Sequence, residues 1–119
     1  MKYMLLIHHV DESEMDEGER VQMLADSVQL CHDLHEHQQY IDAAPLHPST
    51  ETISVKVRDG KRLVTDGPFA ETREQIGGYF MVEAKDLKEA IEIAGRIPSA
   101  RIGTVEVRPV RVVEGLPKP

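Results

Sequence analysis

Residues that can transfer protons are predicted to meet at one edge of the fold. His8 and His9 end an apolar N-terminal run, Asp66 opens an Asp-Gly-Pro-Phe turn, and His47 lies in a loop that contains prolines. A histidine titrates near neutral pH, so a neighbouring carboxylate that orients it can make it a general base or acid. These residue types indicate acid–base chemistry on a small organic molecule, with Asp66 and one of the two N-terminal histidines as the catalytic pair.

Asp66 and the adjacent histidines each leave an alternative open. The Asp66 carboxylate could accept backbone N–H groups in an Asx-type turn and contact no histidine. Strand alternation puts His8 and His9 on opposite faces of a sheet, so only one of them can enter a cleft between sheet and helices. The sequence does not decide between them, and it leaves the reaction open among a hydrolysis, a lyase step and an isomerisation.

Two further residues are candidates for substrate binding. Arg73 follows the turn and could bind a substrate carboxylate or phosphate. With Glu71 and Glu74 it could equally belong to a charged surface patch. His47 could be a loop histidine without a role. We predict His47 and Arg73 as substrate-binding residues at the mouth of the pocket.

Metal ligands are not predicted, and the cofactor requirement is left open. Two histidines and one aspartate suit a facial metal triad, but no H-x-H or H-x-x-x-H pair lies at the predicted edge. His32 and His35 fall in the far half of a long helix, where we interpret them as structural. His37 is on the polar face of the same helix.

Two runs that are apolar on both faces predict central strands of a sheet. They are residues 1–9 and residues 79–82, and Gly77-Gly78 is expected to let the chain turn tightly into the second run. Residues 104–113 supply a last strand. Pro109 places that strand at a sheet edge, because proline cannot donate a ladder hydrogen bond.

A hairpin is predicted in the middle of the chain. Residues 51–58 alternate as a half-exposed strand, and Asp59-Gly60 is a strong turn signal for a return through residues 62–65. That returning strand is expected beside the strand at 79–82. Residues 38–50 lack periodicity and are expected to be a long connecting loop.

Two amphipathic helices complete the predicted elements. The second begins at Asp86, which with Glu89 resembles a capping box, and ends at Pro98. The first covers residues 19–37 and has a broad apolar arc at helical spacing. That arc contains Val21, Leu24, Ala25, Val28, Cys31 and His35, and it is widened by Met23, Leu30 and Leu34.

The order β-α-β-β-β-α-β predicts an α+β fold, a ferredoxin-like split βαβ sandwich with an extra hairpin strand. Both helices should cover one face of the sheet. Because the central strands are apolar on both faces, the other face also needs cover, and a second subunit packed sheet to sheet would provide it. We expect a homodimer of a single domain at residues 1–115, with residues 116–119 as a tail.

Composition narrows the possible partners and compartment. The formal net charge of −7 opposes nucleic-acid binding, which depends on clustered Lys and Arg. Cys31 is the single cysteine, so an internal disulfide is impossible, and we interpret it as a small buried hydrophobe. The apolar run at residues 3–7 is too short for a membrane span or a signal-peptide core. We therefore expect a cytoplasmic protein that binds neither nucleic acid nor membrane.

The segment from Val64 to Phe80, with its Asp66-Gly67-Pro68-Phe69 turn, resembles the signature of the DGPF subfamily of YCII-related proteins. The resemblance extends over nearly the full chain. It includes residues 2–7, residues 57–61, residues 94–100 and residues 105–110.

This resemblance implies a dimeric α+β barrel and a catalytic His and Asp pair, of which only Asp66 carries over to a definite position. His8-His9 replaces the Tyr-rich strand end expected of many members of the family. The resemblance also implies an association with extracytoplasmic-function sigma factors, without direct DNA contact. A non-catalytic ligand-binding or regulatory module is therefore the alternative to an enzyme, and a plain interaction scaffold is a third possibility.

Overall fold

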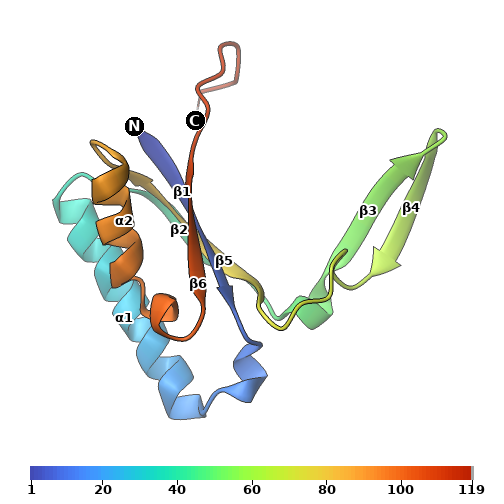
Figure 1. Ribbon diagram of the computed structural model, residues 1–119, viewed down its shortest axis with the longest axis horizontal. Helices are drawn as coiled ribbons and strands as arrows, with labels where there is room; N and C mark the ends of the chain where they lie inside the picture. Colours follow the sequence, from blue (N-terminus) through green and yellow to red (C-terminus); the bar gives the residue numbers. More distant parts are fainter. Residues whose placement is uncertain (119) are drawn as a thin grey trace.

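A four-stranded antiparallel sheet carries both α-helices on one face in the computed structural model, which describes residues 1–118 (Figure 1). The strand order is β2-β5-β1-β6. The strands are β1 (Lys2–His9), β2 (Tyr40–Pro45), β5 (Gln75–Glu83) and β6 (Thr104–Pro109), and the helices are α1 (Glu17–Glu36) and α2 (Leu87–Arg96). The result is a mixed α+β architecture consistent with a ferredoxin-like fold, because a β-α-β unit and a second β-α-β unit interleave in one sheet.

The predicted central strands are confirmed. β1 pairs with both β5 and β6, and β5 pairs with both β1 and β2. Along β1 the buried side chains alternate, and Tyr3, Leu5 and Ile7 face the helices. β6 is an edge strand, as Pro109 predicts, but it ends at Pro109 and does not continue to residue 113 as expected. Gly77 and Gly78 lie within β5, however, and do not precede it.

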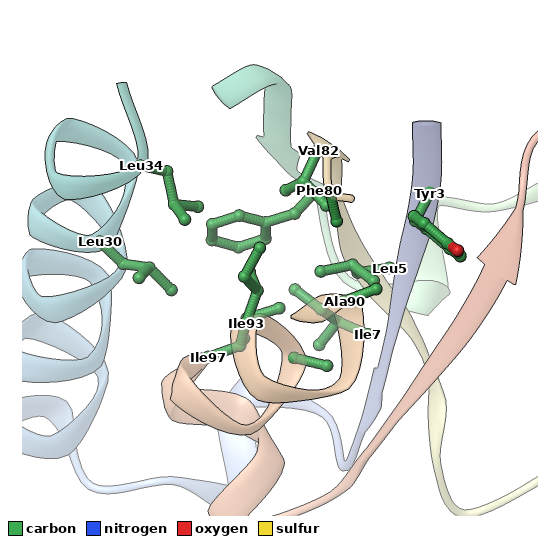
Figure 2. Close-up of a cluster of buried hydrophobic side chains, with 12 residues drawn as sticks. Tyr3, Leu5, Ile7, Leu30, Leu34, Phe80, Val82, Ala90, Ile93 and Ile97 are labelled. Carbon is green, nitrogen blue, oxygen red and sulfur yellow. The ribbon is translucent and has the colours of Figure 1, made fainter. Parts of the chain in front are cut away.

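The core lies between the two helices and the sheet. Figure 2 shows Leu30 and Leu34 of α1 pointing toward the ring of Phe80 in β5, with Ile93 of α2 and Ile97, which directly follows α2, beside it. Leu34 has no exposed surface, and Ile97 is 1% exposed. Burial of these aliphatic side chains, at roughly 25 cal/mol per Å² of apolar surface, holds the helices on the sheet.

The first helix forms where it was predicted, but its buried face is different. The predicted arc is largely outside the core: Val21 is 63% exposed, Leu24 55% and Val28 49%. The residues that were expected only to widen this arc, Leu30 and Leu34, are the buried ones. The apolar arc was wide enough to allow several rotations of the helix, and tertiary packing selects its leucine side.

Residues 40–45 form β2, and the prediction of a loop over residues 38–50 is therefore wrong in this part. β2 pairs antiparallel with β5, from Tyr40 opposite Val82 to Pro45 opposite Gly78. Two alanines, Asp42 and Pro45 obscured the strand pattern, because these residues are uncommon in strands. An edge strand tolerates them, since one side of its backbone needs no ladder partner.

The hairpin formed by β3 (Ile53–Arg58) and β4 (Lys61–Asp66) is a separate two-stranded sheet that projects from the body (Figure 1). Its turn is confirmed: Asp59 has φ 53° and Gly60 φ 73°, the pair of positive angles that a type I′ turn requires. The prediction that the returning strand lies beside β5 is wrong, because β2 occupies that position.

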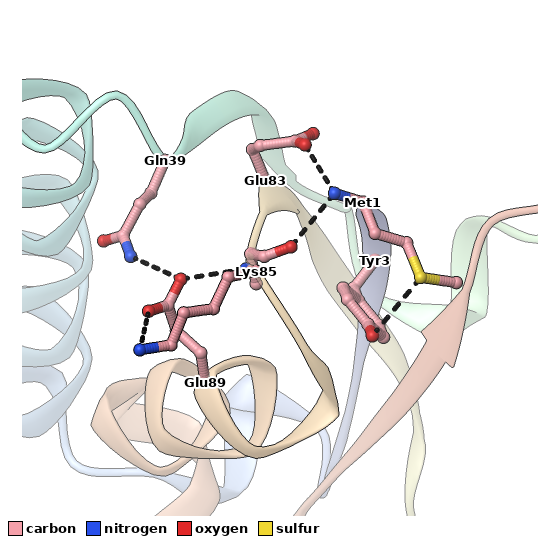
Figure 3. Close-up of polar contacts among 7 residues, drawn as sticks. Met1, Tyr3, Gln39, Glu83, Lys85 and Glu89 are labelled. Carbon is pink, nitrogen blue, oxygen red and sulfur yellow. Dashed lines mark hydrogen bonds and ion pairs between the residues drawn. The ribbon is translucent and has the colours of Figure 1, made fainter.

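Polar contacts fix the ends of the elements opposite the hairpin. Asp86 caps α2 as predicted, accepting from the Glu89 N–H at 2.9 Å. The Glu89 carboxylate in turn accepts from the Lys85 N–H and from the Gln39 amide, while the N-terminal ammonium lies 2.5 Å from Glu83 (Figure 3). Within the described residues neither α1 nor α2 combines the length and apolar character that a bilayer-spanning helix needs.

Candidate active-site cavity

A cavity of about 330 Å³ lies between the N-terminal half of α1 and the ends of β1, β2 and β5. Its walls are mostly apolar. The polar or reactive residues that line it are His9, Glu12, Arg20, Ser27, Cys31, Tyr40, Tyr79 and Ser99. A small, concave, mostly apolar space with a few polar groups is the usual form of a small-molecule site.

His9 is the buried ionisable group of this cavity. It is the last residue of β1, on the same face as Tyr3, Leu5 and Ile7, and it is 7% exposed. Its Nδ1 lies 2.6 Å from the Val10 carbonyl oxygen. A carbonyl only accepts, so Nδ1 carries the proton in the neutral ring and Nε2 keeps a free lone pair.

Glycines make the room in which the His9 ring lies. A Cβ at Gly77 in β5 would overlap the ring, 2.8 Å from Cε1 and closer still to Nε2. A Cβ at Gly103 would lie 3.0 Å from the Cα of His9. The Gly77-Gly78 pair thus lets the His9 ring and strand β2 approach β5 closely. A Cβ at Gly78 would lie 2.8 Å from the carbonyl oxygen of Ala44 in β2.

His8 lies on the opposite face of the sheet, as strand alternation requires. Its Nε2 is 2.5 Å from Oε1 of Glu106 in β6, close enough for an ion pair when the ring is protonated. The alignment does not satisfy hydrogen-bond geometry, and this buried nitrogen has no other partner among the described residues. His8 also borders a separate hollow with Phe69 and Thr104. Of the two histidines, His9 is the one in the cleft between sheet and helices.

The two predicted substrate-binding residues lie near that end of the sheet but outside the main cavity. His47 is 87% exposed, and its Nδ1 is 3.4 Å from Glu51. It does share a small depression with His9, so the structure brings these two histidines to one edge. Arg73 lies 3.6 Å from Glu14 and lines a shallow hollow beside the turn at Gly67.

Asp66 ends β4, opposite Ile53 in the hairpin ladder, and its side chain is exposed. Backbone contacts hold the turn after it: Gly67 N–H donates to the Thr52 carbonyl at 2.7 Å, and the Ser54 hydroxyl donates to the Gly67 carbonyl at 2.6 Å. Within residues 1–118 the Asp66 carboxylate has no hydrogen-bond or ion-pair partner, histidines included. The His and Asp pair therefore stays a prediction.

Sequence reasoning assigned no role in the site to the polar or reactive residues that α1 contributes. Arg20, Ser27 and Cys31 line the cavity from the inner side of the helix, at spacings of seven and four residues. Helical spacing alone would have grouped them with Leu34 if the buried face of α1 had been known. Burial raises the pKa of the Cys31 thiol, which is half-buried. Among residues 1–118 no group of three or more His, Cys, Asp or Glu side chains is arranged to hold a metal ion.

Comparison with known proteins identifies the family. The model of the YCII-related domain matches residues 1–114. This chain is a YCII-related protein. An uncharacterized protein of Rhizobium meliloti (strain 1021) is 32% identical to the YCII-related chain over 123 residues, covering 92% of each.

A solved structure shares the fold of this YCII-related chain at much lower identity. It is the 5-chloro-2-hydroxyhydroquinone dehydrochlorinase TftG of Burkholderia phenoliruptrix AC1100, in complex with 2,5-dihydroxybenzoquinone. The sequence identity is 12%, the TM-score is 0.55, and the match covers 93% of this chain and 94% of the other. The likeness supports the α+β fold.

Proposed function

We propose that this YCII-related protein is a small-molecule enzyme in which His9 is the general base, and afterwards the general acid, of the cavity beneath α1. One observation carries the proposal. The Val10 carbonyl holds Nδ1–H, so the basic Nε2 of His9 belongs to a buried ring in the wall of an apolar cavity. An imidazole held in one tautomer and one orientation is prepared to accept a proton and return it.

The reaction class that fits best is proton abstraction from a carbon or oxygen acid, as in a lyase or isomerase. Nε2 takes the proton from the substrate, and the new electron pair forms a double bond either by expelling a leaving group or by moving along the molecule. The imidazolium then returns the proton to the product or to water. That the neighbouring fold belongs to a dehydrochlorinase acting on a hydroxylated ring is consistent with such chemistry on this scaffold.

The finer assignments are parts of the same proposal. The Asp66-Gly67-Pro68-Phe69 turn supports membership of the DGPF subfamily. Half-buried Met4, Leu6, Tyr79 and Met81, on strands whose alternate residues face the helices, support a homodimer through the outer sheet face and a dimeric barrel. Since Asp66 meets no histidine within one protomer, a His and Asp pair would form between protomers or after movement of the hairpin. His47 and Arg73 would then contact substrate from the rim.

A non-catalytic module linked to sigma factors in the cytoplasm is the second candidate. The observation that favours it is the hairpin, whose Val55 and Val57 are 57% and 62% exposed on a strand that projects from the body. Exposed apolar side chains gathered on one projecting element are typical of interaction sites.

Proton exchange in D₂O distinguishes the two functions without a known substrate. A panel of small carbonyl compounds and phenols is followed by proton NMR for enzyme-dependent loss of a carbon-bound proton. We expect at least one compound to exchange, and His9→Gln to slow the exchange by about 10²-fold or more, the usual contribution of a general base. His8→Gln is the matched control and should keep the wild-type rate. A panel that never exchanges, or a His9→Gln protein with the wild-type rate, would contradict the enzyme assignment.

A further inference from the structure

Arg20 gives the cavity a cationic group in a mostly apolar wall. It stands in the first turn of α1 and lines the same cavity as His9, together with Met23, Leu24 and Phe80. Its side chain is half-buried. The guanidinium is always charged and presents a fork of donors that matches a carboxylate.

The carboxylates near Arg20 form no ion pair with its guanidinium. The ion pairs among the described residues include no carboxylate within 4.0 Å of its guanidinium nitrogens. Glu12 also lines the cavity, and Glu17 and Glu19 share the first turn of α1. The chain carries 21 acidic and 14 basic residues, and yet this guanidinium at the cavity wall is left without a paired carboxylate.

From these observations we propose that the cavity binds a small organic anion, with its carboxylate or phenolate on Arg20 and its apolar body between α1 and the sheet. The ligand is small, because about 330 Å³ is at the lower end of the range of ligand pockets and admits one ring or a short chain. Apolar surface is buried by Met23, Leu24 and Phe80, and the charge is satisfied by a bidentate, charge-assisted contact.

This inference concerns the same cavity as the proposed function, but it does not require that the cavity catalyse a reaction. In the proposed enzyme, Arg20 binds the anion and His9 transfers the proton, so each residue has a separate role. An anionic substrate also favours the protonated His9 that follows proton abstraction, because opposite charges attract more strongly in a cavity with little water. Arg20 is thus a binding residue whose loss should weaken affinity for anions alone.

Benzoate and benzamide are the probes, since they share one ring and nearly one shape but differ in charge. Binding is measured by chemical-shift titration of the wild type, Arg20→Gln, Arg20→Lys and Arg101→Gln. Arg101→Gln is the matched control, because it removes the same charge from an exposed residue that does not line the cavity. Thermal melting of each variant checks that it is folded.

We expect the wild type to bind benzoate about tenfold more tightly than benzamide, a ratio that corresponds to about 1.4 kcal/mol. Arg20→Gln should reduce benzoate affinity to that of benzamide and leave benzamide unchanged. Arg20→Lys should retain part of the preference, and Arg101→Gln all of it. Equal affinities in the wild type, no binding of either probe at millimolar concentration, or equal losses in Arg20→Gln and Arg101→Gln would overturn the inference.

The same titration separates this inference from the proposed function. If benzoate binds through Arg20 and no compound in the panel exchanges a proton, the anion site stands and the enzyme assignment fails. If exchange depends on His9 while the probes show no preference for charge, the enzyme assignment stands and the anion site fails.

Discussion

The imidazole of His9 in β1 occupies the space into which a side chain at Gly77 in β5 would extend. The ring Cε1 lies 2.8 Å from the position of a Cβ at residue 77, and Nε2 is closer still. The two residues thus depend on each other: the histidine is buried in the cavity wall only because its neighbour in the sheet has no side chain.

Gly77→Ala should therefore destabilise the protein and displace His9. Overpacking of this kind costs about 1–3 kcal/mol, which urea denaturation measures. Gly95→Ala is the matched control, because a Cβ there meets nothing within 4 Å and alanine is the better helix former in α2. The control should keep or slightly raise the stability. A Gly77→Ala protein as stable as the wild type would show that His9 can leave its position freely.

Leu6→Glu should convert the proposed homodimer to a monomer. Leu6 lies half-buried on the face of β1 away from the helices, so a charge there would be trapped in a sheet-to-sheet interface. Light scattering coupled to size exclusion measures the mass. Val112→Glu adds the same charge at a residue that is 97% exposed, and this control should keep the wild-type mass. If the wild type is itself a monomer, the proposed interface does not exist.

Tyr79 should titrate above its ordinary pKa of 10.0. Its hydroxyl donates to Asp42 Oδ2 at 2.6 Å. Because only the neutral phenol can donate this hydrogen bond, the contact raises the pKa of Tyr79, and desolvation and the charge of Asp42 raise it further by smaller amounts. The contact tethers edge strand β2 to β5, and its contribution to stability is complete below pH 10.0 and is lost as the pH rises through the folded-state pKa. NMR titration of the Tyr79 ring should show the pKa moving down in Asp42→Ala. An unchanged pKa in that variant would exclude the hydrogen bond as the cause.

Cys31 should react slowly with thiol reagents near neutral pH. Desolvation by burial raises the pKa of its thiol above the ordinary 9.0, which lowers the fraction of reactive thiolate. The rate of reaction with iodoacetamide should rise with pH through a midpoint above 9.0, and the pH profile of a free cysteine model peptide provides the comparison. Because Cys31 lines the cavity, saturating benzoate should slow the reaction further. Reaction at the peptide's rate at every pH would mean that α1 opens away from the sheet readily.

The sequence predicts the elements of this fold better than their contacts. β1, the Asp59-Gly60 turn and the cap at Asp86 are confirmed, because each depends on neighbours in the chain. β2 was missed because its alanines and Pro45 carry little strand propensity, and it forms through its ladder with β5. Because β2 was missed, the predicted topology placed the returning strand of the hairpin beside β5, in the position that β2 occupies.

The sequence likewise predicts some residues of the candidate site and misses others. His9 was among the predicted catalytic residues, and alternation correctly separated it from His8, but only packing shows which of the two lies beneath a helix. Arg20 was missed because the rotation of α1 is a tertiary property: a broad apolar arc fits several orientations, and the leucines at its margin settle the one observed. The role of Asp66 stays a prediction, since its carboxylate has no hydrogen-bond or ion-pair partner within residues 1–118 of a single chain.

The separation of the β3–β4 ladder from the main sheet also has a consequence for folding. No ladder hydrogen bond joins this hairpin to β1, β2, β5 or β6, so it can open without disturbing the sheet that holds the cavity. Its amides should exchange with solvent through local fluctuations, whereas those of β1 wait for global unfolding. We therefore expect the protein to unfold as two cooperative units, of which the less stable one presents Asp66.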